Sequence, residues 1–474
     1  MSVLSADANV TRPLRITIDR TIRIHCAGTD LLEALTKRFQ MINPKWLENE
    51  RMGRWNRDTS KNLKFYRRFG KNGIVIPRGY ARQLMLQLKR DRLAYELEDR
   101  RRTQPAVDFT FSATLKAFQR EAVDVMRKKD FGTLSAPTGS GKTVMGLWLI
   151  AERRQPTVVV VHTKDLAFQW IARIEQFLGI PADEVGLIGA GKKRVGDRIS
   201  VALVQTLYRC ADEIAPRIGH LVVDECHRTP SRTFTEAVTV FDCRYMLGLS
   251  ATPWRRDKLS RLIFWHLGDL RHEVDKVRLE EAGHILKADV VIRPTTFEPY
   301  FDPVNEYARM LSELTADDTR NRLIAADVAQ EAEHGKGVCL VLSDRKKHCE
   351  TLQGLLRFKF DVKADLLIGD MNNEARRLVL ERLENGQVKV LIATGQLIGE
   401  GFDCPDLSTL FMATPIRFSG RVMQYLGRIL RPARGKARAK VYDYVDERVA
   451  PLVAAARARQ RVYGHAPEDL FTLL

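Results

Sequence analysis

The chain has 474 residues, of which 45% are hydrophobic and 29% charged, and carries a net charge of +18. This length allows two or three domains with their own cores. No run approaches the roughly 18 apolar residues of a membrane helix, so we expect no membrane partner. The excess of positive charge favours a polyanionic partner. The first residues lack the charged start and apolar core of a signal peptide, which predicts a cytoplasmic protein.

Residues 1–112 are predicted to form a small α+β module that precedes the rest of the chain. A strand pair, a helix, a hairpin with a turn rich in glycine and asparagine, and a closing helix are expected at residues 14–26, 29–41, 63–79 and 80–91. The polar stretch 96–106 is expected to be a linker.

The positive charge is concentrated in this module. Thirteen Lys and Arg residues lie between Arg51 and Arg92, opposed only by Asp58 and Asp91. Basic residues with interleaved aromatic residues are typical of a nucleic-acid-binding surface, although a solvated basic face would have the same composition. The interleaved aromatic residues are Trp55, Phe65, Tyr66, Phe69 and Tyr80, and the candidate nucleic-acid contacts are Arg67, Arg68 and Arg78.

Residues 113–448 alternate between short apolar, β-branched runs and helical stretches. Continuous apolar strands separated by helices predict parallel sheets that are covered on both faces. The runs fall into two series, which predicts two α/β domains in tandem, residues 113–275 and 276–448, followed by a C-terminal helix at 449–474.

The stretch "SAPTGSGKTV" (135–144) follows a predicted strand and opens a predicted helix, which is the context of a P-loop. Gly139 and Gly141 allow backbone N–H groups to surround a phosphate. Lys142 adds a positive charge, and Thr143 can bind Mg²⁺. Thr138 and Ser140 complete the loop.

The stretch "HLVVDECHRTP" (220–230) is an apolar strand that ends in polar residues. Asp224 is predicted to lie on the Mg²⁺ side of the phosphate site, and Glu225 to orient or deprotonate the attacking water. A metal site built on Cys226 and His227 is the alternative, but none of the seven cysteines forms a C-x-x-C pair. We therefore interpret Cys226 as a packing residue and His227 as a polar coupler.

With "APTGSGKT", "DECH" and "SATP" (250–253) in this order, the chain resembles the superfamily 2 nucleic-acid motors, the DEAD/DEAH-type helicases. "LKAFQREAV" (115–123) resembles the Q motif, "VHTKDLAFQW" motif Ia and "VQTL" (204–207) motif Ib. "ATGQLIGEGFDCPDL" (393–407) and "QYLGRILRP" (424–432) resemble motifs V and VI. Within the superfamily, the chain is most similar to the XPB-like and UvsW-like group.

This resemblance implies a fold of two tandem RecA-like domains, with ATP and Mg²⁺ as cofactors bound between them. The catalytic roles would fall to Lys142, to Glu225 as the base, and to Arg428 and Arg431 as arginine fingers, while Thr143 and Asp224 would hold the metal. The nucleotide would also contact Phe118, Gln119, Gly401 and Asp403. Coupling between ATP and nucleic acid would involve His227, Ser250, Thr252 and Gln424, and the strand itself would be gripped by Thr163, Gln205, Thr206 and Thr394.

The expected function is an ATP-dependent DNA helicase or translocase of repair, recombination or phage replication. Its DNA would be duplex, forked or branched, with single strands as a further possibility. An ATPase subunit of a restriction or other remodelling complex, active only with partners, is the alternative, and an RNA helicase is a weaker one. The expected location is cytoplasmic: nucleoid-associated in a bacterium, or the host cytoplasm for a phage protein.

Overall fold

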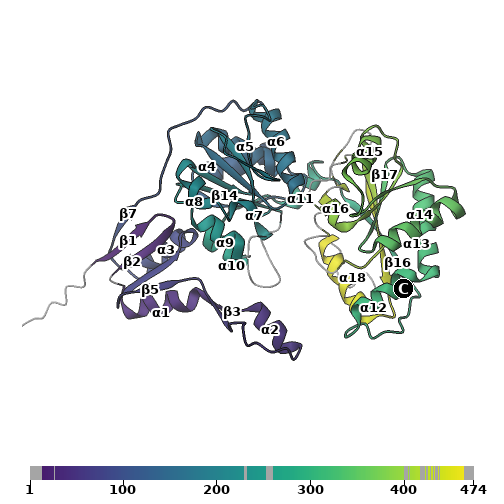
Figure 1. Cartoon of the computed structure of the whole chain (residues 1–474), viewed down its shortest axis with the longest axis horizontal. Coiled ribbons are helices and arrows are strands. Elements are labelled where there is room, and N and C mark those ends of the chain that lie inside the picture. Colours follow the sequence, from purple (N-terminus) through teal and green to yellow (C-terminus); the bar gives the residue numbers. More distant parts are fainter. Residues whose placement is uncertain are drawn as a thin grey trace, which may run out of the picture. The chain divides into compact units, whose positions relative to one another are not determined.

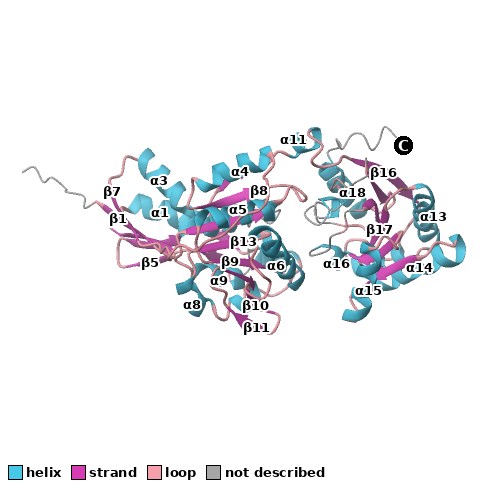
Figure 2. Ribbon diagram, turned by 90° about the horizontal axis from the view of Figure 1, so that it is seen from above, coloured by secondary structure: helices cyan, strands magenta, loops and turns pink. Residues whose placement is uncertain are grey.

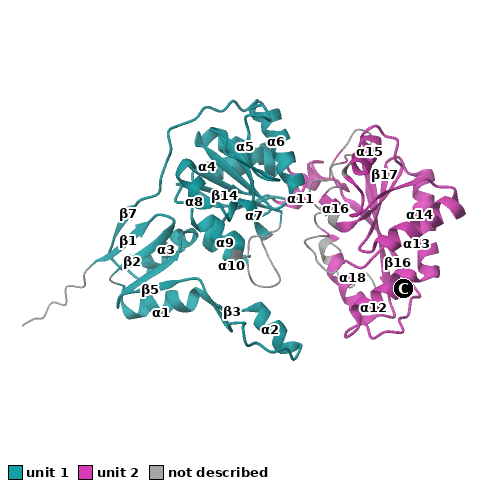
Figure 3. Cartoon of the chain, viewed as in Figure 1, with its two compact units in different colours: residues 1–136, 142–274 teal, residues 137–141, 275–474 magenta. Residues whose placement is uncertain are grey.

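A computed structural model describes residues 13–25, 27–228, 232–251, 260–399, 404, 406–416, 422, 425–427, 429–430, 432, 436 and 438–463. The chain divides into two compact units, coloured separately in Figure 3. The first comprises residues 1–136 and 142–274, and the second comprises residues 137–141 and 275–474. The first unit holds the N-terminal module and an eight-stranded sheet, and the second holds a six-stranded sheet.

The N-terminal module is built on a five-stranded sheet, which confirms the predicted strand pair and hairpin. The sheet has the order β5-β6-β2-β1-β7, with β7 parallel to β1 and the other pairs antiparallel. A two-stranded sheet, β3 with β4, lies outside it. The elements are β1 (Leu14–Ile18), β2 (Thr21–His25), α1 (Thr29–Arg38), β3 (Gln40–Ile42), α2 (Pro44–Arg51), β4 (Asn62–Lys64), β5 (Arg67–Phe69), β6 (Gly73–Pro77), the 3₁₀ turn η1 (Arg78–Tyr80), α3 (Ala81–Arg90) and β7 (Tyr95–Asp99).

The eight-stranded sheet of the first unit has the order β11-β10-β12-β9-β13-β14-β8-β15, and only the β10–β11 pair is antiparallel. Its strands are β8 (Phe131–Ser135), β9 (Thr157–Val161), β10 (Gly186–Gly189), β11 (Lys192–Arg194), β12 (Ile199–Leu203), β13 (His220–Val223), β14 (Tyr245–Ser250) and β15 (Leu270–Glu273). Its helices are α4 (Ala117–Arg127), α5 (Lys142–Arg153), α6 (Lys164–Leu178), α7 (Val204–Leu207), α8 (Ala211–Ile214), α9 (Arg232–Thr239) and α10 (Ser260–Leu267), with 3₁₀ turns η2 (Ala215–Arg217) and η3 (Cys226–Arg228).

The central strands of this sheet are buried along their whole length, which explains their unbroken apolar sequences. Every residue of β8, β9, β12 and β13 is buried, because helices cover both faces of the sheet, as Figure 2 shows. Helix α6 illustrates how local signals set the helix ends. Thr163 caps its first turn by accepting the Leu166 N–H at 3.3 Å, and Gly179 ends it in the left-handed conformation at φ +63°.

The second unit contains the all-parallel sheet that its sequence predicts, in the order β16-β21-β20-β17-β19-β18. Its strands are β16 (Ala288–Thr295), β17 (Val338–Ser343), β18 (Ala364–Leu367), β19 (Val390–Thr394), β20 (Leu407–Met412) and β21 (Ala439–Asp446). Its helices are α11 (Lys276–Glu281), α12 (Tyr307–Ala316), α13 (Asp318–His334), α14 (Lys346–Phe360), α15 (Asn373–Glu384), α16 (Gly395–Gly399) and α18 (Ala450–Tyr463).

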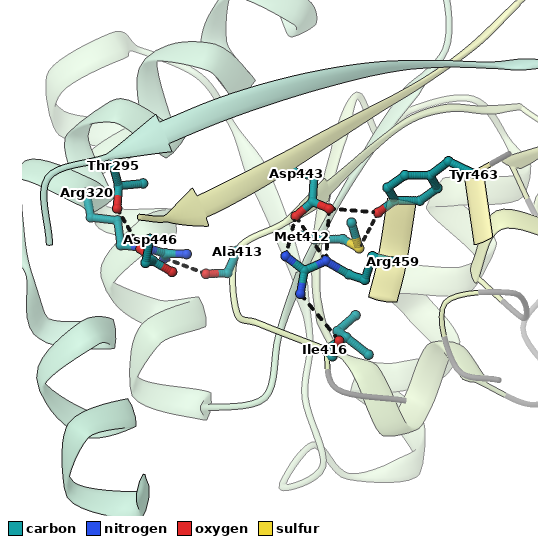
Figure 4. A network of polar contacts seen from close by, with 9 residues as sticks. All are labelled: Thr295, Arg320, Met412, Ala413, Ile416, Asp443, Asp446, Arg459 and Tyr463. Carbon is teal, nitrogen blue, oxygen red and sulfur yellow. Dashed lines mark hydrogen bonds and ion pairs between the residues drawn. The ribbon is translucent and has the colours of Figure 1, made fainter. Parts of the chain in front are cut away.

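Buried ion pairs anchor helices to β21 in this unit (Figure 4). Asp443 accepts from Arg459 of α18 at 2.6 Å and from the Tyr463 hydroxyl at 3.0 Å. Asp446 accepts from the guanidinium of Arg320 at 2.8 Å and from the Thr295 hydroxyl at 2.6 Å. The paired charges neutralise one another where water cannot, so α18 is held against the sheet by a polar contact of fixed geometry.

The N-terminal module and the eight-stranded sheet share one hydrophobic core. Phe39 and Phe65 of the module pack on Trp265 of α10, with ring centroids 4.8 and 5.5 Å apart. A Cβ on Gly79 would lie 2.5 Å from the backbone oxygen of Phe264, so only glycine permits this approach. The module therefore forms part of the first unit's interior.

The segment expected as a linker, residues 96–106, lies along the same unit. Part of it forms β7, which pairs with β1. Arg101 then donates to Asp130 at 2.8 Å, and Arg102 donates to Asp242 at 2.7 Å. These contacts attach the end of the module to the strands that follow it, which leaves no free joint at this point of the described chain.

Arg78 fastens the module to the sheet, and its removal is expected to destabilise the first unit. Its guanidinium is buried and donates to the Cys243 carbonyl at 2.8 Å. Arg78→Ala leaves that buried carbonyl without its donor, so the free energy of unfolding should fall by about 2–4 kcal/mol. Urea unfolding of the full chain measures this, with the exposed Arg68→Ala as control, for which we expect a change within about 0.5 kcal/mol. Equal effects of the two changes would contradict the buried role.

Arg459 provides the corresponding prediction for the second unit. Arg459→Ala strands the buried Asp443 carboxylate, which should lower the free energy of unfolding by about 3–5 kcal/mol. Arg448 forms an exposed ion pair with Glu298 at 3.0 Å and serves as the matched control. Because exposed pairs contribute little, Arg448→Ala should cost less than about 1 kcal/mol. Thermal unfolding of the two variants compares them, and a milder effect of Arg459→Ala would show that α18 is not anchored by this pair.

Candidate phosphate-binding site and nucleic-acid interface

The predicted P-loop lies between β8 and α5, as its sequence indicates. Gly139 and Gly141 have φ values of +88° and +85°, a backbone region that favours glycine. The Ser140 N–H and hydroxyl both donate to the Pro137 carbonyl, at 3.1 and 2.6 Å, and close the turn. Lys142 begins α5, so the loop leads directly into a helix N-terminus, where backbone N–H groups attract anions.

The Lys142 side chain has no carboxylate partner in a hydrogen bond or ion pair among the described residues. Its ammonium donates to the Ala136 carbonyl at 3.2 Å, a neutral acceptor. A lysine without a carboxylate partner at the start of a helix is available to an anionic ligand. The loop thus has the features that a phosphate requires: backbone donors, a helix N-terminus and a lysine.

Asp224 follows β13, two strands away from β8 in the same parallel sheet. Its carboxylate is buried and accepts the Trp170 indole N–H at 2.8 Å and the Glu225 backbone N–H at 2.9 Å. Burial, followed by the adjacent charge of Glu225, raises the pKa of Asp224 to about 6. The charge of Lys142 acts in the opposite direction.

The donor set of this acidic pair fits a Mg²⁺ ion. Two neighbouring carboxylates in a buried position repel each other, and a divalent cation beside them would reverse the effect on the Asp224 pKa. Carboxylate and hydroxyl oxygens are the hard ligands that Mg²⁺ prefers. The predicted ligands Thr143 and Asp224 are of this type, and their roles stay predictions.

Glu225 is linked to the end of β14 through His227. Glu225 has a φ of +47°, which places it in the left-handed region. Its Oε2 lies 3.2 Å from His227 Nδ1, and the same nitrogen lies 3.1 Å from the Ser250 hydroxyl. Ser250 in turn accepts the Ala136 N–H through its carbonyl at 2.9 Å. His227 Nδ1 thus lies close to side-chain oxygens of both Glu225 and Ser250. The coupling roles of His227 and Ser250 stay predictions.

Three further predicted residues have well-defined surroundings. Gln119 is buried, and its side-chain oxygen accepts the Lys116 N–H at 3.0 Å, which caps the start of α4. Phe118 is half-buried beside it. Cys226 is fully buried, and burial raises the pKa of its thiol well above the usual range, in keeping with a packing role. The adenine contacts of Gln119 and Phe118 stay predictions.

The predicted strand-gripping residues of the first unit lie at the carboxyl ends of β9 and β12, which are neighbours in the sheet. Gln205 is exposed, and Thr206 is half-buried in α7. Thr163 has a structural task already, because its hydroxyl caps α6. Thr394, half-buried at the end of β19, occupies the corresponding position in the second unit. Their nucleic-acid contacts stay predictions.

The predicted contact at Arg78 is wrong. Its side chain is 3% exposed. The guanidinium donates to the Cys243 carbonyl oxygen, and its Nη2 lies 2.7 Å from the Met246 sulfur. Charge in the sequence could not separate this buried arginine from its exposed neighbours. Arg67 and Arg68 are exposed on the edge strand β5 and keep their place as candidates.

Six predicted site residues lie outside the described part of the chain. These are Thr252, Gly401, Asp403, Gln424, Arg428 and Arg431. Described residues next to them show how motif VI is anchored: Tyr425 is buried and donates its hydroxyl to the Gly395 carbonyl at 2.8 Å. The arginine-finger roles stay predictions.

Trp170 is a site residue that sequence reasoning missed. It donates to Asp224 across 54 positions of the chain. The only signal in the sequence was its place in the stretch that resembles motif Ia. An aromatic residue on the inner face of α6 is not distinguishable there from an ordinary core residue.

Two family descriptions match the chain, each over one α/β domain. Residues 108–255 match the "Type III restriction enzyme, res subunit" family, and residues 319–433 match the "Helicase conserved C-terminal domain" family. Together they cover more than half of the sequence. The chain belongs to the superfamily 2 helicases, with two RecA-like domains.

Relatives and a solved structure agree with this assignment. "Putative ATP-dependent RNA helicase L396" of Acanthamoeba polyphaga mimivirus is 25% identical over 72% of this chain. "DNA 3'-5' translocase XPB2" of Sulfurisphaera tokodaii is 25% identical over 67% of this chain and 78% of its own. The structure of Saccharomyces cerevisiae Dbp5 bound to RNA and ADP BeF3 is 15% identical, covers 73% of this chain and 87% of its own, and shares the fold with a TM-score of 0.54.

The match spans 66% of the mimivirus relative and 52% of a Rad25 relative from Halobacterium salinarum. None of the helices in the described residues is long and apolar enough to cross a membrane.

Proposed function

We propose that the chain is a nucleic-acid-dependent ATPase that uses ATP to move along or remodel DNA. The observation that carries this proposal is the combination of Lys142, which has no carboxylate partner among the described residues, with the buried Asp224 and its neighbour Glu225 in the same unit. A protein that only binds a nucleotide would need the lysine and a metal ligand, but no adjacent carboxylate to act as a base. Relatives named as DNA 3'-5' translocase and DNA 3'-5' helicase support DNA as the substrate.

In this proposal each residue of the ATP site has a separate role. Lys142 and the backbone N–H groups of the loop bind the β- and γ-phosphates, and Thr143 and Asp224 hold Mg²⁺. Glu225 takes the proton of the attacking water, and Trp170 keeps the Asp224 carboxylate oriented. ATP supplies the phosphoanhydride bond, and Mg²⁺ neutralises phosphate charge. His227, whose Nδ1 lies 3.2 Å from Glu225 Oε2 and 3.1 Å from the Ser250 hydroxyl, would couple the ATP site to the end of β14.

The ATP site is tested by separating binding from hydrolysis. Lys142→Ala removes the phosphate cation and should abolish both tight ATP binding and ATPase activity. Glu225→Gln keeps the size of the side chain but removes the base, so it should lower the ATPase rate by at least about 100-fold while ATP still binds. Steady-state ATPase assays and binding of a fluorescent ATP analogue measure the two effects. Normal hydrolysis by either variant would contradict the assignment.

The polymer is tested with the wild-type chain alone. We expect ATP hydrolysis to rise at least about 10-fold with forked or single-stranded DNA, and less with RNA of the same sequence. The rate is measured with single-stranded, duplex and forked DNA and with RNA, each at saturating concentration and fixed salt, since such binding depends steeply on salt.

The second candidate function is a motor subunit that works only inside a complex. The match of residues 108–255 to the restriction-enzyme family favours it. No stimulation by any polymer, together with intact ATP binding, would support this candidate over the first. Stronger stimulation by RNA would instead support an RNA helicase, the class named for the mimivirus relative.

A further inference from the structure

An arm extends from the N-terminal module and is formed by residues 40–64, which comprise β3, α2, β4 and the loop between α2 and β4. Figure 1 shows β3 and α2 extending beyond α1, away from the five-stranded sheet. The arm is joined to the module by short strands, and no residue of α2 is buried. This segment of 25 residues therefore contributes little apolar burial to the fold of the module.

The arm is nevertheless well ordered by its own hydrogen bonds. Asn56 accepts from the Asn49 amide at 2.9 Å and donates to the Trp46 carbonyl at 3.2 Å, which ties the loop back to α2. Asn43 donates its side-chain amide to the Ser60 carbonyl at 3.0 Å and closes the base. Gly53, at φ +63°, makes the turn that follows α2. The loop therefore holds its side chains in a defined arrangement.

The two tryptophans of the arm differ in exposure. Trp46 is half-buried, and the Lys61 ammonium lies over its ring at 4.9 Å. Trp55 is 89% exposed at the tip of the loop. An ordered loop that presents an indole ring to water has a surface suited to a partner, because such a ring gains free energy when another flat group covers it.

The charges around Trp55 identify the chemistry of that partner. Arg51, Arg54 and Arg57 are exposed, lie within four residues of Trp55, and form no ion pair with another described residue. Unpaired guanidinium groups beside a flat aromatic ring match a chain of phosphates that carries flat bases. A protein partner would need a matching acidic and apolar surface, which is the less general solution.

We propose that the arm binds an unpaired segment of nucleic acid, with Trp55 stacked on an exposed base and Arg51, Arg54 and Arg57 in contact with the flanking phosphates. That the ligand is a nucleic acid rests on the proposed function, whereas the position of the binding surface rests only on the structure of the arm. Because Arg78 is buried, it does not contribute to this surface, and the arm adds to the exposed Arg67 and Arg68 of β5. A base within a duplex offers no free face, so the arm distinguishes single strands and forks from plain duplex.

The test compares Trp55→Ala with wild type in binding a fluorescein-labelled single strand, a fork and a blunt duplex of the same sequence. Stacking on one base is worth enough to predict a loss of roughly 5- to 150-fold for the single strand and the fork. Binding to the blunt duplex should change less than about twofold, and Trp55→Phe should retain most of the affinity. Fluorescence anisotropy at fixed salt measures the affinity for each of the three probes. Because Trp55 is almost fully exposed, the fold should not change.

Tyr300 provides a matched control, since it is 90% exposed and lies in the second unit. Tyr300→Ala should leave binding unchanged. Replacing Arg51, Arg54 and Arg57 together by Gln should make single-strand binding less dependent on salt. The logarithmic slope should fall by about 0.7 for each phosphate that an arginine no longer neutralises.

Three outcomes separate the proposals. If Trp55→Ala binds every probe as wild type does, the arm proposal is overturned, and the exposed tryptophan then faces a protein or solvent. If Trp55→Ala weakens the blunt duplex as much as the single strand, stacking on an unpaired base is also wrong. If the wild-type chain binds none of the probes, both the proposed function and the arm proposal are overturned. ATP hydrolysis without nucleic acid should be the same in Trp55→Ala and wild type, because Trp55 lies outside the ATP site.

Discussion

The proximity of two carboxylates at the carboxyl edge of a parallel sheet is the constraint on which the rest of the first unit depends. Asp224 is buried and next to Glu225, so its charged form needs donors on every open side. Trp170 provides one from α6, and a backbone N–H provides another. The parallel arrangement of β8, β14 and β13 brings Ala136, Ser250 and the acidic pair to the same edge of the sheet.

The same unit joins the basic module to the eight-stranded sheet through a shared core. Trp265 lies between aromatic residues of the module, and Arg78 reaches across to the carbonyl of Cys243. A shared core moves as one body, because its parts cannot separate without exposing apolar surface and unpaired polar groups.

In the second unit, ion pairs rather than aromatic contacts attach helices to the sheet. Asp327 of α13 accepts from Arg293 of β16 at 2.8 Å, and Glu331, one turn later, accepts from Lys440 of β21 at 2.6 Å. With the pairs at Asp443 and Asp446, these contacts fix helices to the sheet in a single register, since a shifted helix would leave buried charges unpaired.

The sequence by itself determined the order and kind of most elements, the two parallel sheets, the P-loop and the acidic pair. These features are local: apolar runs, glycine positions and the residues directly after a strand depend on neighbours in the chain. Only the tertiary structure decided that Arg78 is buried, that Trp170 serves Asp224, that β7 joins β1, and that Trp55 stands exposed on an ordered arm. Each of these depends on contacts, or on their absence, between segments far apart in the chain, and a linear pattern carries no information on which distant groups meet.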